Sequence, residues 1–325
     1  MDVVSDAISA MRIGRPSSQR LRVRGRWCTR LAPYEGAGFH VVLAGSCWLL
    51  PDGGGEPVAL GPGDAVLLPH GTGHVLADGP VDSAEAGRAV PFEEVHGIGP
   101  GPGTGTGIDT GIGFGFGIGS PGGAGRATEL LCGKYRLDRS RAHPLMAELP
   151  EVVHLPNRVG EHPELRTAVD LLARELDDRR PGSCLAVPSL LDLLLVYMVR
   201  AWTADAEAGA WPAVLSDPVT TAALRALHSD PAAPWSNERL AAEAGVSRAT
   251  LARRFTGLVG RPPMAYLTWW RLTLAATLLR SSDAPLASVA RRTGYSSPYA
   301  LSHAFSREFG VTPGKYRLPG PERHP

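Results

Sequence analysis

The periodicity of apolar and polar positions changes along this 325-residue chain. Between residues 27 and 76, short apolar runs are separated by turns rich in glycine, proline and aspartate. This pattern is typical of short strands in a sandwich or barrel. The same texture returns at 128–137. This texture predicts an N-terminal β domain. Apolar residues at helical spacing predict a short helix at 2–12 before it.

Helical spacing follows the predicted β domain. Leu165, Val169 and Leu172 form an apolar stripe in a helix that we expect over 162–178. A second helix, expected over 187–203, is apolar around much of its circumference and therefore needs cover from the protein or from a second subunit. We expect residues 156–216, which include a linker at 204–216, to mediate dimerisation or to relay a signal.

A glycine-rich tract interrupts the N-terminal domain. Residues 97–125 contain 14 glycines, most of them at every second position. Such a segment buries too little side chain to offset the entropy of ordering its backbone. We therefore expect a flexible insertion at about 80–126. One Gly-x-Gly-x-x-Gly match occurs at 117–122, but it does not join a strand to a helix and predicts no dinucleotide site.

Two segments near the C-terminus have the same arrangement, in which a helix, a glycine and a serine precede a second helix. In the first, a helix ends at Gly245 and Ser247 precedes the next helix. In the second, Gly294 stands at the corner and Ser296 or Ser297 precedes the following helix. Serine caps a helix N-terminus, and glycine adopts the left-handed conformation that a tight corner needs. Both segments are predicted to be helix-turn-helix units.

Motifs continue through this region over about 100 residues. They include Ala241-Ala242-Glu243-Ala244-Gly245-Val246-Ser247, Gly260-x-Pro262-Pro263-x-x-Tyr266-Leu267, Val289-Ala290-x-x-x-Gly294-Tyr295 and Phe309-Gly310-x-Thr312-Pro313. The region resembles the DNA-binding domain of the AraC/XylS family. The resemblance implies a domain at 217–319 in which one connecting helix joins two helix-turn-helix units. We expect the last residues, 320–325, to form a disordered tail.

The charge distribution points to the same partner. Residues 218–325 carry 14 Arg and Lys against 6 Asp and Glu, a net charge of +8. Residues 1–217 carry 19 against 26, a net charge of −7. Because the C-terminal part is basic and the rest of the chain is acidic, we expect only the C-terminal part to bind a polyanion. We expect that partner to be double-stranded DNA.

Candidate DNA contacts lie on the second helix of each unit, because a recognition helix turns one face to the base edges. Arg253 is the strongest candidate for a bidentate contact with guanine. His303 stands where many members of the family have Arg or Lys. From the exposed faces and the resemblance together, the expected contacts are Arg248, Ala249, Thr250, Ala252, Arg253, Arg254, Pro298, Tyr299, Ala300, Ser302, His303 and Arg307.

The segment from Gly63 to His74 is similar to the second cupin motif. The first cupin motif is incomplete: His40 stands at its first ligand position, Val42 replaces the second and Cys47 falls at the Glu position. The resemblance implies a cupin-type sensor domain at 1–155. The predicted fold class is thus α+β, with an N-terminal cupin-like β-barrel, flanking helices and an all-α C-terminal domain of two helix-turn-helix units.

Four side chains of the predicted barrel form a candidate metal site. They are His40, Cys47, His74 and, on a late strand, Cys132. Two imidazoles and two thiols suit tetrahedral zinc. We favour the structural interpretation, in which the histidines are hydrogen-bonded and the cysteines are buried small apolar groups, because no short Cys-x-x-Cys spacing supports a site.

The sequence therefore predicts a sequence-specific DNA-binding transcription regulator, controlled by a small molecule or a metal in the cupin barrel. We expect a homodimer that contacts RNA polymerase if it is an activator. One alternative is a metal-dependent cupin enzyme acting on a small substrate, although the broken ligand set argues against it and no catalytic residue is predicted. Another is an architectural DNA binder without a sensor.

The sequence also bears on location. The acidic N-terminus lacks the features of a secretory signal. No uninterrupted apolar run approaches the about 20 residues of a membrane span. The four cysteines are too widely spaced to indicate a disulfide framework. We expect a cytoplasmic protein with reduced thiols and no membrane partner.

Overall fold

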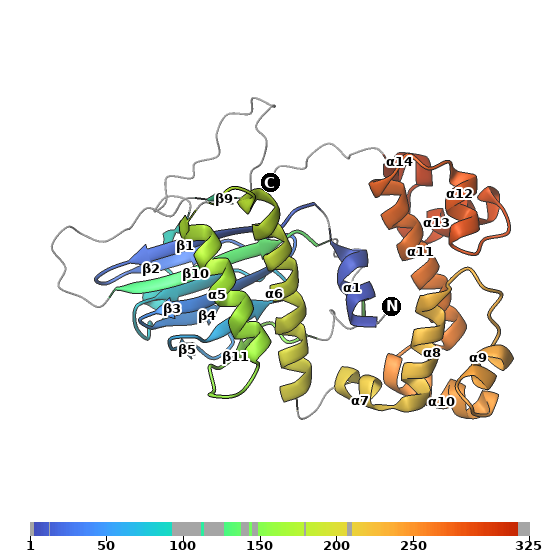
Figure 1. Cartoon of the computed structure of the whole chain (residues 1–325), viewed down its shortest axis with the longest axis horizontal. Coiled ribbons are helices and arrows are strands. Elements are labelled where there is room, and N and C mark those ends of the chain that lie inside the picture. The colour runs from blue at the N-terminus through green and yellow to red at the C-terminus, as the bar shows by residue number, and fades with distance from the viewer. Residues whose placement is uncertain are drawn as a thin grey trace. The chain divides into compact units, whose positions relative to one another are not determined.

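The structure of the protein is a computed structural model (Figure 1). The residues it describes are 3–12, 14–92, 112–113, 127–137, 143–144, 149–178, 180–206 and 210–317. They belong to two compact units. The sheet unit comprises Met11–Ala142 and Leu149–Asp205. The helix unit comprises Met1–Ala10, His143–Glu148 and Ala206–Pro325.

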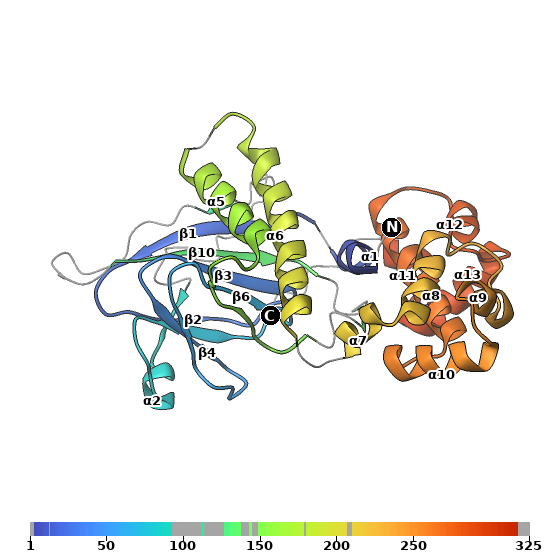
Figure 2. The same cartoon turned by 60° about the horizontal axis from the view of Figure 1, so that its bottom comes forward.

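The described strands of the sheet unit form two sheets (Figures 1 and 2). The six-stranded sheet has the order β11-β6-β3-β10-β1-β9, and the five-stranded sheet has the order β5-β4-β7-β2-β8. The strands are β1 (Ser17–Val23), β2 (Cys28–Leu31), β3 (Ala37–Ala44), β4 (Cys47–Pro51), β5 (Val58–Leu60), β6 (Ala65–Leu68), β7 (His74–Ala77), β8 (Val90–Pro91), β9 (Ile112–Gly113), β10 (Thr128–Tyr135) and β11 (Val153–Leu155). The predicted β domain is confirmed.

Strand β3 is buried on both faces along residues 37–42. On one face, Phe39 contacts the ring of Tyr135, whose hydroxyl donates a 2.7 Å hydrogen bond to the carbonyl of Leu191 in the helical layer. On the other face, His40 lies opposite Cys132 in the antiparallel register, and such cross-strand partners share a face. A strand covered on both sides is apolar throughout instead of alternating.

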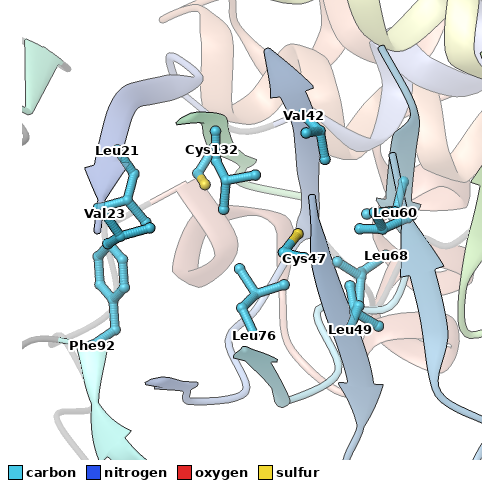
Figure 3. Packing of buried hydrophobic residues seen from close by; sticks show 12 residues of the cluster. Leu21, Val23, Val42, Cys47, Leu49, Leu60, Leu68, Leu76, Phe92 and Cys132 are labelled. Atoms are coloured by element: carbon cyan, nitrogen blue, oxygen red, sulfur yellow. The ribbon is translucent and has the colours of Figure 1, made fainter. Parts of the chain in front are cut away.

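The core between the sheets is an apolar cluster (Figure 3). Its buried members are Leu21, Val23, Val42, Cys47, Leu49, Leu60, Val66, Leu68, Leu76, Phe92, Leu130 and Cys132. Cys47 comes from the five-stranded sheet and Cys132 from the six-stranded one. Apolar burial of this kind is the main source of stability for the unit.

Two helices cover the six-stranded sheet (Figure 2). They are α5 (Pro163–Asp178) and α6 (Ser183–Asp205). Helix α6 begins four residues before the expected start, so Pro188 lies inside it. Its buried residues pack on α5 and the sheet, which cover part of its apolar surface. Its length and composition alone would also suit a membrane span, a test that a core helix passes equally well.

The start of the insertion differs from our expectation. Residues 83–86 form helix α2 (Ser83–Ala86), and β8 pairs in parallel with β2. Phe92 is buried in the core cluster. The chain from residue 80 to residue 92 is therefore part of the folded unit. Within 97–125, the structure describes only β9, which pairs with β1, and the rest of the tract lies outside the described residues, as does the tail at 320–325.

Helices make up the described part of the helix unit. They are α1 (Val3–Met11, whose last residue belongs to the sheet unit), α7 (Ala210–Ser216), α8 (Pro218–Ser229), α9 (Asn237–Glu243), α10 (Arg248–Val259), α11 (Pro263–Ser281), α12 (Leu286–Arg292), α13 (Pro298–Phe309) and α14 (Pro313–Arg317). Helix α7 occupies part of the expected linker and packs on α8 and α10. The linker is therefore largely helical.

The helix unit also includes two segments that we expected in the sensor domain. They are α1 and the segment that begins at His143. The Nδ1 atom of His228 lies 3.0 Å from the Asp6 carboxylate, and its Nε2 lies 2.7 Å from the Tyr266 hydroxyl. Nε2 of His143 lies 2.9 Å from the same hydroxyl. This buried chain of hydrogen bonds holds α1 and His143 to α8 and α11.

Candidate DNA-binding surface and sensor interior

The first helix-turn-helix unit consists of α9 and α10. Ser236 caps α9 and Ser247 caps α10, each by accepting a hydrogen bond from a backbone amide three residues on. Gly245 has φ +68° at the corner, a conformation that glycine adopts without strain. Leu251 and Phe255 on α10 are fully buried. The buried side of α10 thus fixes which side faces outward.

The outward side of α10 presents several of the predicted contacts. Ala249, Ala252 and Arg253 are exposed. The Arg253 side chain forms no hydrogen bond or ion pair with any described residue. An unpartnered guanidinium on an exposed face keeps all five of its donors available for a ligand.

Two neighbouring arginines are less available. Arg248 forms a 2.6 Å ion pair with Glu238 on α9. Arg254 forms a 3.1 Å ion pair with Asp217, the N-cap of α8. Burial opposes ionisation of Asp217, but its hydrogen bonds with Thr220 and the Arg254 charge outweigh burial, so its pKa lies below the usual value. Arg254 thus ties α10 to α8.

The second unit consists of α12 and α13. Ser297, one of the two expected caps, accepts a hydrogen bond from the amide of Ala300. Tyr299 is 80% exposed at the start of α13, and His303 and Arg307 are exposed further along. A large exposed aromatic side chain beside basic groups is typical of a surface that binds a partner.

The remaining predicted contacts also lie on these two helices. Thr250 is half-buried, and its hydroxyl lies 2.9 Å from the hydroxyl of Ser247. Pro298 is exposed, and Ala300 and Ser302 are half-buried. The structure therefore gathers the sequence-predicted residues on two helices, each of which follows a glycine corner.

The interior of the sheet unit contains a pair of buried histidines. Nε2 of His40 lies 2.8 Å from Nε2 of His74. Nδ1 of His74 donates to the carbonyl of Thr72 at 3.1 Å, which leaves Nε2 of His74 as the acceptor for the proton on Nε2 of His40. Burial lowers the pKa of both histidines, and the neighbouring imidazole lowers that of His40 further. The pair is therefore neutral.

The two cysteines are not drawn into this pair as metal ligands. Burial raises the pKa of Cys47 to about 12 and raises that of Cys132 as well. Within the described ranges, no three His, Cys, Asp or Glu side chains are grouped as a metal site requires. As they lie here, His40, Cys47, His74 and Cys132 do not form the candidate zinc site, because the Nε2 lone pair of His74 accepts the hydrogen bond from His40.

Sequence reasoning missed a cleft on the sheet unit. It has a volume of about 340 Å³ and opens between α5 and the strands β3, β6 and β11. Val42, Leu165 and Val169 line it with apolar surface, and Arg166 and Asp170 add charge. Its lining comes from segments more than 100 residues apart, so no local motif could have indicated it.

Comparison with known proteins agrees with both halves of this description. The family described as Cupin matches residues 2–204, and the Helix-turn-helix domain family matches residues 240–318. An AraC-like transcription regulator of Streptomyces antibioticus is 35% identical over 320 residues, which cover 98% of each chain. The chain belongs to the AraC family of transcription regulators.

Further matches belong to the same family. An AraC-like regulator of Streptomyces lividans is 37% identical over 319 residues, again covering 98% of each chain. The solved DNA-binding domain of AdpA in complex with a target DNA is 39% identical, covers 31% of this chain and 91% of that one, and has a TM-score of 0.30. The full-length relatives identify this AraC-family protein as a DNA-binding transcription regulator with a cupin domain.

Proposed function

We propose that this AraC-family regulator recognises double-stranded DNA with α10 and α13 together. The observation that carries the proposal is that both helices follow a serine cap and a glycine corner, bury one face and expose the other. A helix of this kind enters the major groove and contacts base edges with three or four side chains. The net charge of +8 on residues 218–325 supplies attraction to phosphates.

The side chains on the two helices have different proposed roles. Arg253 donates to a guanine in the major groove. Tyr299 and His303 contact bases or the sugar-phosphate backbone at the second site. The ion pair of Arg248 ties α10 to α9 and that of Arg254 ties α10 to α8, and both arginines contact phosphate at most.

The regulator is proposed to respond to a small molecule. The interior of the sheet unit is filled by its apolar cluster, whereas the cleft beside α5 is open and offers apolar and charged groups side by side. A small amphipathic molecule fits such a lining. We propose that the effect of ligand binding reaches the DNA-binding helices through the chain itself. The segment His143–Glu148 belongs to the helix unit, whereas the residues before and after it belong to the sheet unit.

We further propose a cytoplasmic homodimer that contacts RNA polymerase if it activates transcription. Leu171 on α5 and Leu185 and Leu193 on α6 are exposed large apolar side chains, of which Leu185 is 74% exposed. A second copy of the same helix pair would cover them in an isologous contact. No enzymatic activity is proposed, because the relatives that match over 98% of this chain are transcription regulators.

Selection from a random DNA library tests this function. Purified full-length protein is incubated with random duplexes, and bound DNA is amplified and sequenced over several rounds. We expect one motif with two conserved segments about one helical turn apart. Enrichment without any motif, at affinities equal to those for random DNA, would favour the architectural DNA binder instead. The Arg253→Ala protein, selected in parallel, is the matched control, and its motif should lose one position.

A further inference from the structure

Arg271 stands at a junction of three segments of the helix unit. It lies in the middle of α11, the helix that connects the two helix-turn-helix units. Its Nε donates to the carbonyl of Pro231 at 2.7 Å and its Nη2 to the carbonyl of Ala233 at 2.9 Å. Its guanidinium also lies against Gly294, the corner of the second unit. One side chain thus touches the loop that precedes the first helix-turn-helix unit and the corner of the second.

The loop that Arg271 holds leads directly into the first unit. Asp230 accepts a hydrogen bond from the amide of Ala233 at 3.1 Å, and its carbonyl accepts one from Nε1 of Trp235 at 2.8 Å. The guanidinium of Arg239 on α9 lies 4.5 Å from the centre of the Trp235 ring. The loop is therefore fixed internally and to α9, so a shift of the loop would carry the α9–α10 pair with it.

The second unit packs directly on this junction. Gly294 has φ +77°. A Cβ atom there would lie 2.8 Å from the guanidinium carbon of Arg271 and 2.9 Å from the Cα of Ala232. Both distances are shorter than a normal carbon contact, so only glycine fits. The corner of one unit therefore rests on the entry loop of the other, with Arg271 between them.

We propose that Arg271 is a positioning residue that fixes α10 relative to α13 and thereby sets the spacing, in base pairs, between the two DNA segments that the protein recognises. This rests on the proposed function, in which both helices bind one duplex. Successive major-groove segments on one side of DNA are about 34 Å and 10 base pairs apart, so each inserted base pair turns one segment by about a tenth of a helical turn. A rigid pair of recognition helices accepts one spacing only.

The test is a series of binding titrations on defined duplexes. The parent duplex is the one most enriched by the wild-type protein from the random library. Two derivatives have one or two base pairs inserted between its segments, and a third has the second segment scrambled. The variants are Arg271→Ala and Arg271→Lys. Arg225→Ala is the matched control, since Arg225 is exposed on α8 and forms no hydrogen bond or ion pair with a described residue.

The Arg271→Ala protein is expected to bind the parent duplex on the order of tenfold more weakly, because a looser link between two binding modules lowers their effective concentration. Its affinity for the duplex with the scrambled segment should stay within about twofold of wild type, and insertions should cost it less than they cost wild type. Arg271→Lys should lie between the two, because an ammonium group reaches one carbonyl where the guanidinium fork reaches both. Arg225→Ala should match wild type.

Three results would overturn the proposal. The insertions could lower the affinity of the Arg271→Ala protein as much as they lower that of wild type. Alternatively, Arg271→Ala could lower the affinity for every duplex, the scrambled one included, by the same factor. Gly294→Ala, which keeps the charge and disturbs the same junction, could retain wild-type affinity and spacing preference. If wild-type protein itself ignores the second segment, the proposed two-helix function fails first; if wild type discriminates and Arg271→Ala discriminates equally, the Arg271 proposal alone fails.

Discussion

The buried histidines should make the stability of the protein strongly dependent on pH between 7 and 5. Burial is the main cause that lowers the pKa of His40, His74 and His143 below 6.5 in the folded state. Unfolding exposes them to water and returns their pKa to about 6.5. Below that pH the unfolded chain binds protons that the folded chain does not, so the free energy of unfolding falls as the pH falls.

The magnitude follows from the width of the pH window. Each proton bound only by the unfolded state changes the free energy of unfolding by about 1.4 kcal/mol per pH unit. A histidine that stays neutral in the folded state down to pH 5 therefore lowers the free energy of unfolding by up to about 2 kcal/mol between pH 7 and pH 5. His40 and His74 together account for up to about 4 kcal/mol in the sheet unit. Glu129 and Asp217, whose pKa values are lowered below those of ordinary carboxyls, respond at lower pH and do not interfere.

Urea unfolding of the full chain at half-unit steps from pH 7 to pH 5 measures this effect. Far-ultraviolet circular dichroism reports the unfolding of both units. The double variant His40→Leu/His74→Leu should lose most of the pH dependence of the sheet unit, since neither leucine titrates. His303→Gln is the control, because His303 is exposed on α13. A free energy of unfolding that is constant from pH 7 to pH 5, or a double variant as pH-dependent as wild type, would refute the reasoning.

Three further predictions concern other parts of the chain. Deleting residues 97–125 removes the two-residue edge strand β9 and its pairing with β1, and it should lower the melting temperature only slightly and leave DNA affinity nearly unchanged, because a shorter connection changes the loop entropy little; loss of folding would contradict this. Asp6→Ala should lower the free energy of unfolding by about 1–3 kcal/mol in denaturant titrations, because it leaves the buried His228 donor unsatisfied, while Asp6→Asn, which keeps an acceptor, should cost less. Leu185→Glu combined with Leu193→Glu should convert a dimer to a monomer in sedimentation, and a wild-type monomer would end the dimer proposal.

Local signals in the sequence were enough to predict the helix-turn-helix units. Serine caps and glycine corners act within three or four residues, so Ser247, Gly245 and Gly294 indicate the helix ends without knowledge of the rest of the fold. The outward side of α10 followed from the spacing of Leu251 and Phe255. These predictions depended on short-range chemistry, and the structure agrees with them.

Long-range features were not predictable in the same way. The apolar positions of α1 show which of its faces is buried but not that Asp6 meets His228, which lies 222 residues further on. Arg271 bonds to main-chain carbonyls, which leave no mark in the sequence. The sequence alone did not show that the histidines at the cupin ligand positions lie with their Nε2 atoms 2.8 Å apart, because their strands belong to different sheets.

The central claim is that exposed side chains on α10 and α13 recognise a specific DNA sequence, and paired binding titrations test it most directly. Wild-type, Arg253→Ala and Arg291→Ala proteins are titrated onto the selected duplex and a scrambled duplex at several salt concentrations. Arg253→Ala should cost about 1–3 kcal/mol on the selected duplex and relax preference at one base pair. Arg291, exposed at the end of α12, should contact phosphate only, so Arg291→Ala should weaken both duplexes alike and lower the salt slope by about one unit. Equal losses by both variants on both duplexes would contradict sequence recognition by α10.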